Sequence, residues 1–96
     1  MDKEQELLKY SDPEKVSRAV RKYLGKDVEL YISSRKNKKY MVQSPDGKWI
    51  HFGLFGAEDW SRHQDPIRRE NFRRRNAKWA TAPKWSPAFI SYWTLW

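Results

Sequence analysis

Apolar side chains recur at helical spacing in the first third of the chain. They occupy successive positions i, i+3, i+4, i+7 and i+8, which form one face of an α-helix. These positions are Val16, Ala19, Val20, Tyr23 and Leu24. Ser11 and Glu14 have the spacing of a capping box, Pro13 suits a first helical turn, and Gly25 is a typical stop. The pattern predicts an amphipathic helix over residues 13–24.

A two-residue alternation replaces the helical spacing after Gly25. Val28, Leu30 and Ile32 share one face of a predicted strand over 28–33. Further strands are predicted over 40–43 and 48–53, with the basic turn 35–39 between the first and the second. Because short turns separate the strands, the order predicts an antiparallel meander.

The turn at residues 44–47 sets the predicted register of the second hairpin. Pro45 at its second position and Gly47 at a positive-φ position indicate a type I turn with a bulge, which pairs Ser44 with Lys48. A two-residue Asp-Gly turn would instead set Val42 opposite His51, a poorer match of polarity. In the preferred register Val42 faces Ile50 and Tyr40 faces Phe52, and the opposite face carries Met41, Gln43, Trp49 and His51.

The last third of the chain predicts two more helices. Residues 53–64 read as a loop with room for one helical turn, and Asp65-Pro66 starts a helix that runs to about Trp79. Ser86-Pro87 opens a short C-terminal helix rich in aromatic residues.

These elements predict an α+β fold. A three-stranded antiparallel meander packs with two helices and a short aromatic C-terminal helix. Residues 1–10 are expected to form an N-terminal segment that can fray, and residues 11–96 a single small basic domain.

Composition narrows the class of protein further. The chain has six Trp and no Cys in 96 residues, which excludes disulfides, thiol catalysis and thiolate zinc sites. Its start has no apolar signal region, and no apolar run reaches the roughly 20 residues of a membrane span. The sequence therefore predicts a protein that is not secreted and has no membrane partner.

The positive charge is concentrated in one part of the sequence. Residues 1–34 carry seven basic and seven acidic side chains, whereas residues 35–96 carry thirteen and five, which accounts for the whole net charge of +8. All six Trp lie in the same basic part. A basic, aromatic region of this kind favours a polyanionic partner.

The basic part also resembles a known family. The resemblance covers about 34–96 and rests on the runs 39–42 and 47–53, the spaced residues Gly56, Asp59, His63, Asp65, Arg68, Arg69, Phe72 and Arg75, and the aromatic end Tyr92, Trp93, Leu95 and Trp96. The family comprises small basic proteins of large double-stranded DNA viruses and some phages. Because that family is uncharacterised, the resemblance implies a viral origin, in the virion or inside the infected cell, and no activity.

An arginine-rich helix is the strongest functional signal. Helical spacing spreads four basic side chains over one broad side, opposite Ile67, Phe72 and Trp79. Such a side can neutralise phosphates, and the basic turn can assist it. Trp49, on the outer face of the hairpin, can stack on a base. The predicted nucleic-acid contacts are Arg35, Lys36, Lys38, Lys39, Arg69, Arg73, Arg74, Lys78 and Trp49.

Arg68 and Arg75 are predicted to behave differently from the other arginines. They project between the apolar residues of the helix and therefore toward the protein, where a guanidinium needs a partner. Glu58 and Asp59 are the acids in the preceding loop, and Asp59 with Arg75 is the predicted structural pair.

The sequence favours a non-enzymatic protein that binds nucleic acid, with duplex DNA preferred, without strong sequence specificity and with genome packaging as one role. One alternative is a virion assembly protein that uses the basic face and the aromatic tail as a protein interface. A second is a small metal-dependent nuclease built from His51, Asp59, His63, Asp65 and Glu70. Their spacing matches no metal motif, so no cofactor, metal ligand or catalytic residue is assigned.

Overall fold

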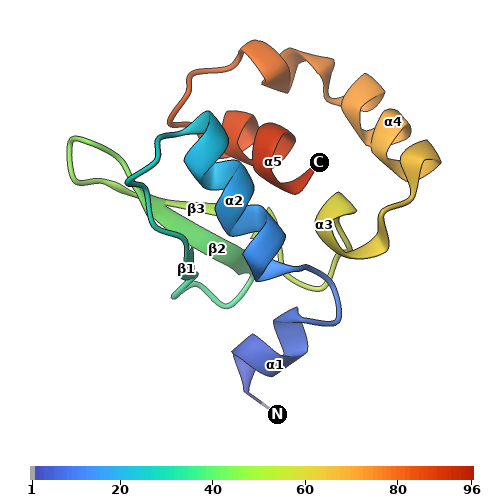
Figure 1. The fold of residues 1–96 in the computed structure, drawn as a ribbon, viewed down its shortest axis with the longest axis horizontal. Helices are drawn as coiled ribbons and strands as arrows, with labels where there is room; N and C mark the ends of the chain where they lie inside the picture. Colours follow the sequence, from blue (N-terminus) through green and yellow to red (C-terminus); the bar gives the residue numbers. More distant parts are fainter. Residues whose placement is uncertain (1) are drawn as a thin grey trace.

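The computed structural model describes residues 2–96 as an α+β fold, which confirms the predicted class. Its strands form an antiparallel sheet in the order β1-β2-β3, with two helices before them in the sequence and the other helices after them (Figure 1). The elements are α1 (Lys3–Leu7), α2 (Pro13–Tyr23), β1 (Tyr31–Ile32), β2 (Lys38–Gln43), β3 (Trp49–Leu54), α3 (Trp60–His63), α4 (Pro66–Arg75), the 3₁₀ helix η1 (Ala77–Thr81) and α5 (Pro87–Leu95).

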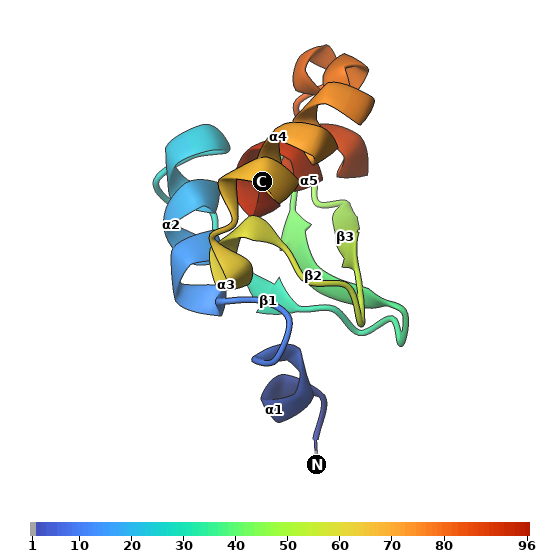
Figure 2. The same ribbon diagram turned by 90° about the vertical axis from the view of Figure 1, so that its right-hand side faces the viewer.

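The core lies between the sheet and two helices. α2 packs against α5, α5 packs against β3, and α4 with η1 forms an arch outside α5 (Figures 1 and 2). α1 lies at the opposite end of the molecule from the arch (Figure 2). The buried apolar side chains are Leu7, Val16, Val20, Leu24, Tyr40, Val42, Phe52, Ile90 and Leu95.

The second hairpin has the predicted register. Val42 pairs with Ile50 and Tyr40 with Phe52. The Ser44 amide donates to the Lys48 oxygen at 2.9 Å, and Gly47 has a φ of 87°. The first strand is shorter than predicted, because only Tyr31 and Ile32 pair with β2. Val28 and Leu30 still pack against the core, but the Val28 amide bonds to the Gly25 oxygen in a turn.

The predicted start of α2 is confirmed, but its predicted cap and the predicted end of α4 are wrong. Asp12, not Ser11, caps α2, and its carboxylate accepts from the Glu14 and Lys15 amides. The α-helix that was expected to reach Trp79 ends at Arg75, because the chain leaves helical geometry at Asn76. The Asn76 side chain bonds back to the Phe72 oxygen at 3.0 Å, and the chain continues as η1. This break changes the direction in which Trp79 projects.

Gly53 is required where β3 passes α5. Its φ is 81°, and a Cβ there would lie 3.0 Å from Leu95 Cδ1 and 3.2 Å from Lys39 Cβ. Gly53→Ala should therefore lower the free energy of unfolding by about 1–3 kcal/mol through backbone strain and by a similar amount through overpacking. Chemical denaturation measures the sum.

Gly56→Ala is the matched control for this change. Gly56 also has a positive φ, 97°, but a Cβ there would meet nothing within 4 Å beyond its chain neighbours in the part of the chain that the structure describes. The control carries the strain without the clash, so equal losses in the two variants would contradict the proposed contact with Leu95 and Lys39.

Candidate functional site

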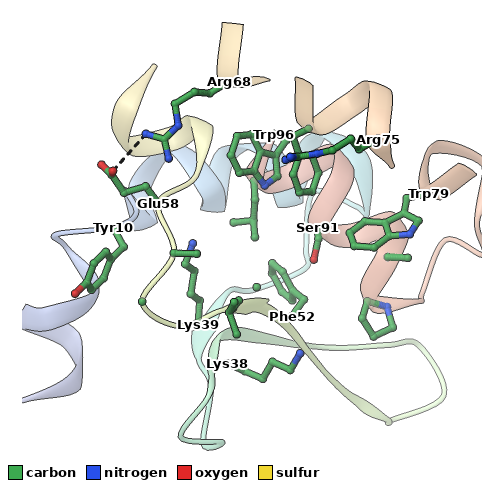
Figure 3. Close-up of a pocket in the computed structure, with 18 of the residues that line it drawn as sticks. Tyr10, Lys38, Lys39, Phe52, Glu58, Arg68, Arg75, Trp79, Ser91 and Trp96 are labelled. Carbon is green, nitrogen blue, oxygen red and sulfur yellow. Dashed lines mark hydrogen bonds and ion pairs between the residues drawn. The ribbon is translucent and has the colours of Figure 1, made fainter. Parts of the chain in front are cut away.

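A groove of about 1170 Å³ lies between the end of the β2–β3 hairpin and the arch of α4 and η1 (Figure 3). Its walls come from four parts of the chain: the segment after α1, the two paired strands with the loop that follows, the arch, and α5. The charged, aromatic and polar side chains of its lining include Lys9, Tyr10, Lys38, Lys39, Phe52, Glu58, Arg68, Phe72, Arg75, Trp79, Ser91 and Trp96.

The groove is strongly cationic. Lys9, Lys38, Arg68 and Arg75 line it, and Glu58 is the one carboxylate on its lining within residues 2–96. Glu58 is itself paired with Arg68, at 3.3 Å between Oε1 and Nη1. Arg75 is exposed and forms no ion pair with any carboxylate of the described chain. An anionic ligand would therefore meet the positive charge of Lys9, Lys38 and Arg75, which no ion pair within the described residues neutralises.

Aromatic rings form much of the rest of the lining. Phe72 of α4 stacks on Trp96, with ring centroids 4.2 Å apart and planes 8° from parallel. Trp79 meets Phe72 edge to face at 5.8 Å and is 36% exposed. The groove thus combines cations with an accessible indole, a pairing typical of nucleic-acid sites.

Lys39 lies on the groove floor but is not an available cation. Its side chain is 2% exposed, and Nζ lies 2.9 Å from Oδ2 of the equally buried Asp59. Burial lowers the pKa of Lys39, while the nearby Asp59 opposes that shift. The prediction that Lys39 contacts phosphate is wrong, because the ammonium is enclosed and already paired.

Asp59 is the centre of a buried polar network. Its carboxylate accepts from the Ser61 amide at 3.0 Å and from the Ser61 hydroxyl, and it caps α3. Ser61 Oγ lies 3.2 Å from Ser11 Oγ, and the Tyr40 hydroxyl donates to Ser11 Oγ at 2.6 Å. Burial raises the pKa of Tyr40. The predicted Asp59–Arg75 pair is wrong, because Lys39 occupies the place expected for Arg75.

Three arginines of α4, Arg69, Arg73 and Arg75, face the opposite way from the prediction. Arg69 and Arg73, expected to point outward, are half-buried, and both donate from Nε to the main-chain oxygen of Trp96, Arg73 at 3.1 Å. The Arg69 guanidinium also lies over the Trp60 ring at 4.4 Å, and burial lowers its pKa. These two arginines hold the arch to the C-terminal residues.

Other predicted contacts lie outside the groove. Arg74 is exposed and pairs with Glu70 at 2.8 Å. Trp49 is 46% exposed and contacts Tyr31 edge to face on the open face of the sheet. Arg35, Lys36 and Lys78 are exposed. Of the nine predicted contacts the groove contains only Lys38 and the buried Lys39.

Several groove residues have no ligand role in the sequence-based prediction. The helical wheel assigns Arg68 and Arg75 to the scaffold, and Trp79 to the apolar side of a helix that ends earlier than expected. Asn76, a poor helix former, is a usable sign of that earlier end. Lys9 and Tyr10 carry no motif, and only the packing of α1 brings them to the site.

The residues considered for a metal site do not converge. Within residues 2–96 no three His, Asp or Glu side chains are placed to share a metal ion. Asp59 and Asp65 cap helices, and His63 Nδ1 accepts from the Asp65 amide at 2.9 Å. His51 Nδ1 lies 2.6 Å from Ser33 Oγ. Each of these residues already has a structural partner, although His63 Nε2 is buried without a hydrogen-bond partner among the described residues.

Comparison with known proteins places the chain in a family. Residues 28–76 match DUF5754, a family of unknown function, and the chain belongs to it. Searches of curated proteins and of solved structures gave no match. Over residues 2–96, none of the helices has the length and apolar character needed to cross a membrane.

Proposed function

We propose that this protein binds nucleic acid through phosphate contacts, without catalysis and without strong sequence specificity. The groove carries the proposal, because Lys9, Lys38 and Arg75 line it without an ion pair among the described residues, while Glu58 is already paired with Arg68. Exposed Arg35, Lys36, Arg74 and Lys78 add positive charge elsewhere on the surface. In a DNA virus, the origin that the sequence resemblance implies, such a protein would serve genome packaging.

Phosphate binding by the groove predicts a defined salt dependence. Each phosphate contact contributes roughly 0.7–0.9 to the slope of log K against log salt, through counterion release. Arg75→Gln and Lys38→Gln should each weaken binding to DNA and lower that slope by about this amount. Titration of labelled oligonucleotides at several salt concentrations, followed by fluorescence anisotropy, measures both quantities.

Arg21→Gln provides the matched control. Arg21 is an exposed arginine on α2, outside the groove, and its replacement makes the same change in net charge. An equal loss of slope in Arg21→Gln and Arg75→Gln would show a general charge effect and would contradict a site at the groove. Absence of any salt-dependent binding by the unaltered protein would reject the proposed function altogether.

A further inference from the structure

The groove has a cationic side chain on each of two opposite walls and aromatic residues between them. Arg75 extends from α4 along one wall, Lys38 lies on the opposite wall, and Phe52, Trp79 and Ser91 lie between them (Figure 3). Phe52 is fully buried, so a ligand that fills this space meets a cation at each side and the partly exposed Trp79 ring in the middle.

Trp79 is held in position before any ligand arrives. It contacts Phe72, which in turn stacks on Trp96. The next residue, Ala80, accepts a hydrogen bond from Trp93 Nε1 of α5 at 3.1 Å. Since η1 is fixed at both of these points, the partly exposed indole is a preformed surface for another flat ring.

We infer that the groove binds single-stranded nucleic acid, with one unpaired base against Trp79 and the neighbouring phosphates on Arg75 and Lys38. This inference rests on the proposed function and specifies its ligand. A duplex keeps its base faces stacked inside, so it can offer phosphates to the groove but no ring to Trp79. An acidic peptide would match the cations and leave the indole without a flat partner.

The test separates the contribution of the bases from that of the phosphates. The probes are an oligothymidylate, an abasic oligodeoxynucleotide of the same length, a duplex of the same length and poly-glutamate, all at one salt concentration. The protein should bind oligothymidylate about tenfold more tightly than the abasic strand, within the range expected for one base stacked on an aromatic ring. It should also prefer oligothymidylate to the duplex.

Variants locate the base contact. Trp79→Leu keeps an apolar side chain at the arch and should abolish the preference for oligothymidylate while leaving abasic binding unchanged. Trp79→Phe restores a ring and should restore most of the preference. Trp49→Leu, which removes an exposed tryptophan outside the groove, is the control and should behave as the unaltered protein. Circular dichroism confirms that each variant is folded.

The outcomes distinguish this inference from the proposed function. Equal binding of oligothymidylate, abasic strand and duplex would overturn the inference and leave phosphate binding intact. Loss of the base preference in Trp49→Leu, but not in Trp79→Leu, would move base binding to the open face of the sheet and would also overturn it. If poly-glutamate competes as well as oligothymidylate, or if no nucleic acid binds, both proposals fail.

Discussion

Replacing Asp59 by alanine should lower the free energy of unfolding by about 3–5 kcal/mol, because it leaves the Lys39 ammonium buried without a counter-charge. The free energy of unfolding of a domain of this size is about 5–15 kcal/mol in total, so the variant should be close to unfolding at 37 °C. The change also removes the cap of α3 and the acceptor of the Ser61 amide and hydroxyl. Urea denaturation followed by tryptophan fluorescence measures the loss.

The double variant supplies the control. Replacing Lys39 by methionine in the Asp59→Ala background removes the stranded charge and keeps most of the side-chain volume. A buried ion pair can be replaced by apolar groups at little cost, so the double variant should recover a large part of the stability lost in Asp59→Ala. No recovery would mean that the loss comes from the cap and the Ser61 contacts and not from Lys39.

Leu7→Ala should lower the free energy of unfolding by about 2–5 kcal/mol, because it empties a filled position of the core. Leu7 is fully buried, although α1 has only five residues. Lys3 also ties α1 to the turn after β1, since its Nζ donates to the oxygens of Ser33 and Arg35 at 2.7 and 2.6 Å. Thermal unfolding compares the variant with the unaltered protein.

Leu8→Ala is the neighbouring control. Leu8 is 50% exposed, and its replacement should change stability by no more than about 0.5 kcal/mol. Equal effects at the two positions would contradict the docking of α1 through Leu7.

Most of the fold could be predicted from the sequence, because the signals that define it are local. The spacing of Val16 and Val20 and the turn at Gly47 each constrain only a few neighbouring residues. The helix start at Asp65-Pro66 is of the same kind, and the structure has it there. Such features are fixed by residues that lie side by side in the sequence.

The site could be predicted only in part, because it depends on which face of α4 turns inward. An apolar stripe normally decides that orientation, but α4 has no buried residue and Ile67 is 70% exposed. The helix is held instead by Arg69 and Arg73 on the Trp96 oxygen and by the Phe72–Trp96 stack. Residues more than 20 positions apart make these contacts, and no spacing rule within the helix reveals them.

The groove is divided between the span that defines the family and the segments on either side of it. Lys38, Arg68 and Arg75 lie within residues 28–76, whereas Tyr10, Trp79 and Trp96 lie outside that span. Most of the charge therefore belongs to the shared part of the chain, and most of the exposed ring surface to its flanks. A related chain could keep the cations that attract an anion and replace the flanking rings. The preference for one ligand over another could then change while the electrostatic attraction stays the same.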